Sequence, residues 1–223
     1  MDSSDNCRKA ARALEDTKYD EDFCLAIDFA PRFIAELMAA GFLVMSCETK
    51  EEETEQNKNI ILIPRHHLVR SCLFFPELHI KKSIKPHLEL YEIYFDRDFD
   101  RIFDRCIAIH GEDWLTAPLV NAIKEIRNTP YMPVKPVSFA LYQKDKLLAG
   151  EIGIVSGRVY TSYSGYYDEA NAGTVQMIQS SQYLQNNGFA FWDLGMPLDY
   201  KLTLGAREIS RGEFLDLFQM AQH

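Results

Sequence analysis

The stretch that decides the fold is Phe189-Ala190-Phe191-Trp192-Asp193-Leu194-Gly195. It is apolar except for one carboxylate, which predicts a buried strand with Asp193 near its end. An ionised acid in a buried strand costs several kcal/mol unless another group pairs with it or uses it. Asp193 is therefore a candidate site residue. The alternative interpretation, an aspartate that caps the following turn, remains open on this pattern alone.

Strands and one long helix surround this stretch between residues 137 and 211. Alternating apolar residues predict strands at 137–142, 147–155 and 158–164. A helix is predicted from about residue 168 to residue 187, ended by Gly188. The strand at 189–194 is then expected to return beside the earlier strands, and a second helix is expected to close the chain.

The preceding residues predict a small N-terminal domain of mixed structure. A loose or helical tail at 1–19, a helix at 31–40, strands at 42–45 and 60–63, and an acidic loop at 48–59 are expected. The domain boundary is set at residue 70, with a second domain at 71–223. The remaining predicted elements are a strand at 90–95 and helices at 99–109 and 118–127.

Composition limits the class of protein. The chain has 223 residues, 26% of them charged, and a formal net charge of −9. That charge argues against a broad basic surface that coats nucleic acid, and no DNA partner is expected. No apolar run is long enough to span a bilayer, and the polar first twenty residues predict no secretory signal. Five cysteines without a CxxC pair predict free thiols in a reducing cytoplasm.

One segment is locally basic. Arg70, Lys81, Lys82 and Lys85 belong to it, and a solvated face and a phosphate contact are both open interpretations. The pair His66-His67 lies in the same segment, but no third ligand follows at a recognisable spacing, so no metal is expected.

Several short motifs, in this order, resemble those of the leucyl/phenylalanyl-tRNA–protein transferase family. The matching stretches are Leu78-His79-Ile80-Lys81-Lys82-Ser83, Asp113-Trp114-Leu115-Thr116, Val137-Ser138-Phe139-Ala140-Leu141-Tyr142 with Leu147-Leu148-Ala149-Gly150, Glu169-Ala170-Asn171-Ala172, Phe191-Trp192-Asp193 and Leu204-Gly205-Ala206-Arg207-Glu208-Ile209-Ser210-Arg211. Arg70 can be set against an arginine of a further family motif. The resemblance runs from about Ile60 to the C-terminus.

The resemblance implies a fold and an activity. The fold is α+β, with a C-terminal domain of the GNAT-like (acetyltransferase) type built on a mixed central sheet and a small α+β N-terminal domain. The activity is transfer of an amino acid from the 3′ end of tRNA to the N-terminus of an acceptor protein, without a cofactor. Asp193 would hold the reacting ammonium and accept its proton. Trp114 would stack on the terminal adenine, although a core tryptophan is the alternative. Arg70, Lys81, Lys82 and Lys85 would bind phosphates of the acceptor stem.

Three positions depart from the family pattern. Tyr163 replaces a glutamate, Gly195 replaces a glutamine that serves the chemical step, and Glu151 replaces a methionine of the aminoacyl pocket. A water beside Gly195, or a hydroxyl such as that of Ser164, would have to take over from the glutamine.

The changed residues predict a different cargo. A carboxylate repels an apolar side chain but pairs well with a guanidinium, so Glu151 predicts arginine as the donated amino acid. Loss of a glutamate at Tyr163 fits an acidic first residue on the acceptor. The predicted activity is thus arginyl transfer that marks acceptors for N-end-rule (N-degron) degradation. The alternative for Glu151 is an ion pair with Lys146 or Arg158.

Other functions remain open from the sequence. Leucyl/phenylalanyl specificity could be retained despite Glu151. Loss of the family's glutamate and glutamine also permits an inactive protein that binds tRNA ends or protein N-termini. An acyl-CoA-dependent N-acetyltransferase is disfavoured, because the turn at residues 166–173 is acidic and lacks a pyrophosphate-binding glycine motif.

Overall fold

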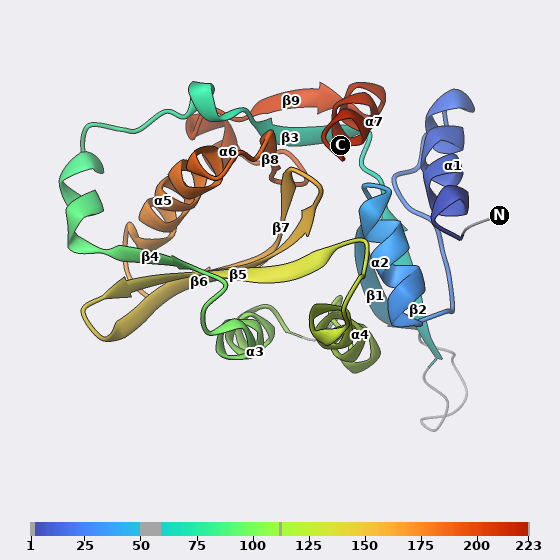
Figure 1. Ribbon diagram of the computed structural model, residues 1–223, viewed down its shortest axis with the longest axis horizontal. Coiled ribbons are helices and arrows are strands. Elements are labelled where there is room, and N and C mark those ends of the chain that lie inside the picture. Colours follow the sequence, from blue (N-terminus) through green and yellow to red (C-terminus); the bar gives the residue numbers. More distant parts are fainter. Residues whose placement is uncertain (1–2, 50–58, 112, 223) are drawn as a thin grey trace.

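The computed structural model describes residues 3–49, 59–111 and 113–222. Its ribbon is shown in Figure 1. The N-terminal half contains α1 (Ser3–Asp16), α2 (Pro31–Ala39), β1 (Leu43–Thr49), β2 (Asn59–Arg65), β3 (Val69–Leu73), the 3-10 turns η1 (Phe75–Glu77) and η2 (Lys85–Leu90), β4 (Glu92–Phe95), α3 (Phe99–His110) and α4 (Ala117–Asn128). The C-terminal half contains β5 (Lys135–Gln143), β6 (Lys146–Ser156), β7 (Val159–Tyr167), α5 (Ala172–Asn186), β8 (Phe191–Asp193), α6 (Asp199–Thr203), β9 (Arg207–Ser210) and α7 (Arg211–Met220).

A seven-stranded mixed sheet forms the centre of the molecule. Its strand order is β4-β5-β6-β7-β8-β3-β9, and β7 and β8 are the parallel pair. Parallel neighbours need a long crossover, which α5 supplies between β7 and β8. The α+β class and the predicted strands β5 to β8 are confirmed. The assignment of the C-terminal domain to the GNAT-like type stays a prediction.

Helices cover the two faces of this sheet (Figure 1). On one face α3 packs so closely that a Cβ on Gly150 of β6 would lie 2.8 Å from Ile102. The buried side chains of α2, α3 and α4 join one core with this face, and those of α5 join a second core with the opposite face. Any side chain of β6, β7 or β8 therefore belongs to the α3 side or the α5 side.

The N-terminal part has its own two-stranded sheet of β1 and β2. The Tyr163 hydroxyl of β7 donates a hydrogen bond to the Val44 carbonyl of β1, which ties this sheet to the large one. The expected boundary at residue 70 falls inside β3, a strand of the large sheet. The division into two domains stays a prediction, and most of the predicted acidic loop lies outside the described residues.

Several element boundaries differ from those expected. β8 covers only Phe191–Asp193, and β2 continues through Pro64 to Arg65. Five of the described elements were not predicted: the strand β3, the 3-10 turns η1 and η2, the short helix α6 and the edge strand β9.

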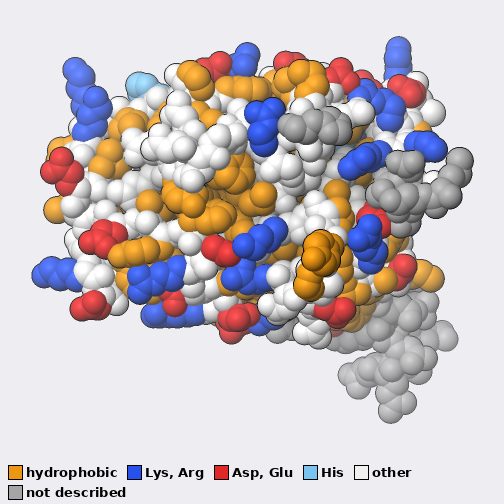
Figure 2. Space-filling view, in the orientation of Figure 1, with side chains coloured by type: hydrophobic (Ala, Val, Ile, Leu, Met, Phe, Trp, Pro, Cys, Tyr) orange, Lys and Arg blue, Asp and Glu red, His pale blue; other side chains and the backbone are white. Residues whose placement is uncertain are grey.

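The surface agrees with the charge pattern of the sequence. Figure 2 shows hydrophobic side chains near the centre of one face and intermixed Lys, Arg, Asp and Glu side chains around it, without a broad field of one sign. None of the described helices is long and apolar enough to cross a membrane.

Candidate functional site

Asp193 is buried at the end of β8 and accepts three hydrogen bonds. Its Oδ2 accepts hydrogen bonds from Arg70 Nη1 and Thr161 Oγ1, each at 3.1 Å. Its Oδ1 accepts one from the backbone N–H of Gly195 at 2.9 Å. The carboxylate therefore caps the following turn, as one interpretation of the sequence had it, and also forms a buried ion pair.

Arg70 is the partner that the sequence did not suggest. Its side chain has no exposed surface, and its Nη2 donates to the Gly41 carbonyl at 2.7 Å. The guanidinium also lies over the Phe214 ring, 4.3 Å from its centroid. A buried guanidinium cannot reach a tRNA phosphate, so the structure does not fit the expected phosphate contact of Arg70.

Gly195 lies in a closed turn after β8. Its φ of +77° falls in the left-handed region, and an added Cβ would lie 3.3 Å from Leu43 Cδ1. The Ser71 N–H donates to the Gly195 carbonyl at 2.7 Å. A side chain is disfavoured here by backbone conformation as well as by space.

Lys201 of α6 returns to this turn, and sequence analysis missed it. Its Nζ donates to the carbonyls of Leu194 and Met196, at 2.5 and 2.8 Å, on either side of Gly195. Burial lowers the pKa of Lys201, while the nearby charges of Asp193 and Glu151 act in the opposite direction. A lysine in a short exposed segment gives no sequence signal for such burial.

Glu151 is buried on β6 among neutral partners. Ser162 Oγ donates to its Oε1 at 2.7 Å, and Gln176 Nε2 of α5 approaches its Oε2 at 3.3 Å. Burial raises the pKa of Glu151, and these two hydrogen bonds partly oppose that rise. Lys146 instead pairs with Glu169 at 2.7 Å.

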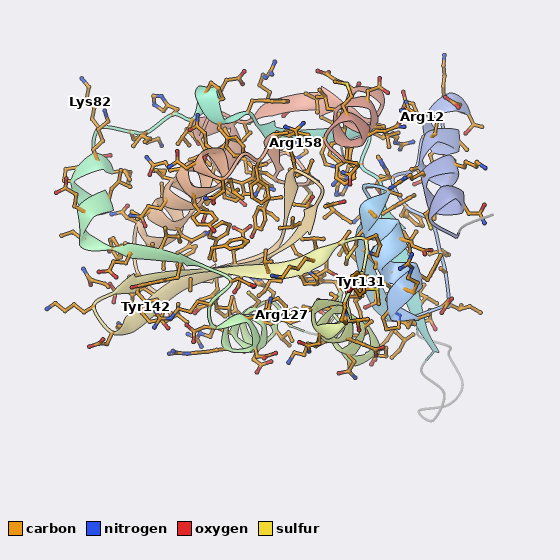
Figure 3. All side chains as sticks on the ribbon, in the orientation of Figure 1. Arg12, Lys82, Arg127, Tyr131, Tyr142 and Arg158 are labelled. Atoms are coloured by element: carbon orange, nitrogen blue, oxygen red, sulfur yellow. The ribbon has the colours of Figure 1, made fainter. Side chains whose placement is uncertain are left out.

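The alternative ion pair of Glu151 with Lys146 or Arg158 is therefore wrong for Lys146. It also finds no support for Arg158, whose side chain is exposed on the turn beside the C-terminal helix (Figure 3). No ion pair within 4.0 Å joins Glu151 to a cation among the described residues.

Glu151 and Asp193 belong to opposite faces of the sheet. The Ser162 hydroxyl that binds Glu151 also accepts a hydrogen bond from Trp192 Nε1 at 2.8 Å. Trp192 and Asp193 are consecutive in a strand, so their side chains point to opposite faces. Lys201 lies within electrostatic range of both carboxylates.

Trp114 and Tyr163 contact each other on the Asp193 side of the sheet. Their ring centroids are 5.6 Å apart, and Trp114 is half-buried. Burial raises the pKa of the Tyr163 hydroxyl. Tyr163 and Thr161 line a small hollow with Gly41 and residues of α2 and β1. Tyr163 and Glu151, expected in one pocket, are thus on different faces.

None of the remaining candidates hydrogen-bonds to Asp193 in the described part of the chain. Ser164 is buried beside Cys106 of α3, and its hydrogen bond opposes the burial that raises the pKa of that thiol to about 12. Lys81, Lys82 and Lys85 are exposed around η2. Figure 3 shows Lys82 at one end of the molecule, with Arg12 of α1 at the other.

Comparison with known proteins identifies the family. Residues 72–219 match the family model described as leucyl/phenylalanyl-tRNA protein transferase. A leucyl/phenylalanyl-tRNA--protein transferase of Pseudomonas aeruginosa is 32% identical over 155 residues, 67% of either chain. One from Campylobacter jejuni is 27% identical over 149 residues, 66% of this chain and 67% of the relative. The chain belongs to the leucyl/phenylalanyl-tRNA–protein transferase family.

The similarity of this chain to solved structures is weak. The C-terminal domain of a putative lysylphosphatidylglycerol synthetase from Agrobacterium fabrum aligns with a TM-score of 0.41 and 12% identity, over 94% of this chain and 62% of that one. A similarity of this size is too weak to indicate a shared fold.

Proposed function

We propose that this transferase moves arginine from charged tRNA to the N-terminus of cytoplasmic proteins whose first residue is acidic, and so marks them for N-degron degradation. The observation that carries the arginyl specificity is Glu151. Its carboxylate is buried and is bonded to the neutral side chains of Ser162 and Gln176.

A buried carboxylate of this kind favours a cationic cargo. Its desolvation is uncompensated by a direct ion pair, and a guanidinium would supply one with short, charge-assisted hydrogen bonds. An apolar cargo would leave the desolvation uncompensated. The same residue therefore attracts arginine and disfavours leucine and phenylalanine.

The length of the cargo matters as much as its charge. The reacting α-amino acid group would lie at Asp193, whereas Glu151 is on the other face of the sheet. The cargo side chain must therefore pass from one face of the sheet to the other, in the neighbourhood of Lys201, which lies within electrostatic range of both carboxylates. Arginine, with a long stem and a terminal charge, suits that path better than a short branched side chain.

In the transfer step the free α-amine of the acceptor protein attacks the ester carbonyl of the aminoacyl-tRNA. A new amide C–N bond forms, the C–O bond to the ribose breaks, and the amine proton ends on the ribose oxygen. A carboxylate has about four acceptor positions, of which Asp193 uses three, so Oδ1 keeps one for a donated ammonium or for the proton in transit. Alignment of the two reactants supplies up to about 7–11 kcal/mol without a metal or cofactor.

The proposed contacts with tRNA are assigned to side chains that are exposed or half-buried. The half-buried Trp114 is proposed to stack on the terminal adenine, and the exposed lysines Lys81, Lys82 and Lys85 to contact acceptor-stem phosphates. The acidic acceptor is supported by the replacement of the family's glutamate by Tyr163. Ser164, beside Cys106, is a weaker candidate for the chemical step than it was from the sequence.

A leucyl/phenylalanyl donor is the second candidate, because the relatives are named for it. An inactive protein that grips tRNA ends is the third, because Gly195 replaces the family's glutamine.

One assay separates these candidates. tRNAs charged with labelled Arg, Lys, Leu or Phe are offered with peptides that begin with Asp, Glu, Arg or Lys, and products are identified by mass spectrometry. Transfer of Arg to Asp or Glu supports the proposal, and Asp193→Ala serves as the inactive control. Transfer of Leu or Phe but not Arg overturns the specificity, and no transfer from any tRNA overturns the activity.

A further inference from the structure

The turn that follows Asp193 has Gly195 at its centre and therefore no central side chain. Gly195 holds a left-handed conformation that a larger residue would strain, and Leu43 closes the space beside it. The backbone groups of Gly195 are bound inward, its N–H to Asp193 and its carbonyl to Ser71. The carbonyls on either side of it, from Leu194 and Met196, accept from a single side chain, that of Lys201.

Lys201 brings a buried ammonium to that position. Only 7% of the residue is exposed, and a lysine is rarely buried so fully without a specific partner. An ammonium has three N–H donors, and two of them are bound to the two carbonyls, so one is left beside the turn. The charge lies within range of Asp193 on one side and Glu151 on the other.

We propose that Lys201 is a positioning residue for aminoacyl transfer, which holds the Leu194–Met196 turn beside Asp193 in a chain that lacks a side chain at position 195. Its ammonium clamps the two carbonyls that flank Gly195 and fixes the direction from which Asp193 Oδ1 meets the substrate. A longer residue at position 195 could hold the turn in place through its own side chain. Lys201, which lies six residues further on in a helix, supplies this contact instead. This inference rests on the proposed transfer activity, and it is independent of which amino acid is the cargo.

If Lys201 holds the turn in place, its replacement should slow the transfer step and leave substrate binding unchanged. Lys201→Met keeps an unbranched side chain of nearly the same length but removes its donors, so the turn is free to shift. A misplacement of about 1 Å near a reacting group can cost about 10²-fold in rate. We therefore expect about 100-fold slower single-turnover transfer and unchanged affinity for aminoacyl-tRNA. Lys146→Met, at an exposed lysine paired with Glu169, is the matched control and should transfer at the wild-type rate.

The charge of Lys201 gives a second readout that a merely structural residue would not move. The groups that face it are Asp193 of β8, Glu151 of β6, Arg70 of β3 and its neighbour Tyr200 in α6. Because burial lowers the pKa of Lys201, its ammonium is lost at a lower pH than usual, and the transfer rate should fall as pH rises through that value. Lys201→Arg keeps the charge and should remove this alkaline decline.

The experiment measures single-turnover transfer, corrected for spontaneous ester hydrolysis, across the alkaline pH range for wild type, Lys201→Arg, Lys201→Met and Lys146→Met. Filter binding of charged tRNA and thermal unfolding are measured in parallel. A rate loss in Lys201→Met at unchanged affinity, together with an alkaline decline present in wild type and absent in Lys201→Arg, supports the proposal. If Lys201→Met does not fold, the Lys201→Arg profile decides.

Two results overturn the proposal in distinguishable ways. If the wild type transfers and Lys201→Met does so at the same rate, the role of Lys201 is excluded. The same holds if Lys201→Arg keeps the alkaline decline of the wild type. In both cases the transferase activity itself still stands. A wild-type protein that transfers no amino acid removes both.

Discussion

Replacement of Glu151 by glutamine removes the charge from the proposed cargo contact while keeping its shape. Ser162 can still donate to the amide oxygen, and Gln176 can turn its own amide to meet the new N–H₂ group. The main change is therefore the loss of a negative charge in a buried position.

The size of the effect follows from the bond that is lost. A hydrogen bond to a charged group contributes about 1.5–3 kcal/mol, and about 1.4 kcal/mol corresponds to a tenfold change. We expect Glu151→Gln to lower the preference for Arg over Leu by about 10- to 100-fold. Glu151→Met should weaken Arg transfer further and admit Leu, because it removes the hydrogen bonds as well.

The assay is a competition between tRNAs charged with Arg and with Leu for one acceptor peptide. Its readout is the ratio of products, which cancels changes in the amount of active protein. An unchanged ratio in Glu151→Gln would refute the idea that this carboxylate selects the cargo.

Stability provides an independent check on the burial of Glu151. Its pKa in the folded protein is raised above the ordinary value of 4.5, so the folded state favours the protonated form. The stability from this group is complete below that ordinary value and is lost as pH rises through the raised pKa. Glu151→Gln should then gain stability relative to wild type as pH rises through this window. Equal unfolding curves across it would show that the carboxylate is solvated.

Three further substitutions test other contacts of the site. Asp193→Asn leaves Arg70 buried without its counter-charge, so it should lower the free energy of unfolding by about 3–5 kcal/mol and abolish transfer, and a denaturant-stable variant would contradict the ion pair. Tyr163→Phe removes the hydrogen bond to the Val44 carbonyl and should lower the free energy of unfolding by about 1 kcal/mol, as measured by thermal unfolding. An unchanged stability would contradict a contribution from this bond. Lys82→Ala should reduce the slope of log affinity for tRNA against log salt by about 0.7–0.9, and an unchanged slope would exclude a phosphate contact.

The part of the fold that could be predicted is the part with regular patterns. β5, β6 and β7 are long strands that alternate or run apolar and are joined by tight turns, so local sequence defines them. β3 and β9 are short, and each carries charged residues such as Arg70 and Arg207. Their strand conformation comes from pairing of β3 with β8 on one side and with β9 on the other, which no local pattern reveals.

The position of Arg70 shows the same limit at the site. It belongs to a segment that is basic as a whole, from Arg65 to Lys85, and a count of charges cannot separate a surface arginine from a buried one. Its partner Asp193 is 123 positions away. Only the pairing of β3 with β8 brings the two together, so the sequence predicted a buried Asp193 but not that Arg70 is buried beside it.

One shift in strand register decides on which face of the sheet each serine hydroxyl of β7 lies. Ser162 and Ser164 are two positions apart and would share a face in a regular strand. The register shifts opposite Ile152 and Gly153, so Ser162 pairs with Gly153 on the Glu151 side while Ser164 pairs with Ile152 on the α3 side. A bulge of this kind leaves no mark in composition, so the sequence does not show that Ser162, rather than Ser164, is the hydroxyl that binds Glu151.

The contacts of the buried cations Arg70 and Lys201 are the reason to favour a cargo contact for Glu151 over a structural ion pair. Arg70 is committed to Asp193, and Lys201 directs its Nζ to the carbonyls of Leu194 and Met196. Lys201 therefore moderates the field at Glu151 without bonding to it. A carboxylate that served only the core would gain most from a direct partner, since a buried charge without one destabilises the fold. Its retention among neutral donors is best explained if the missing cation arrives with the substrate.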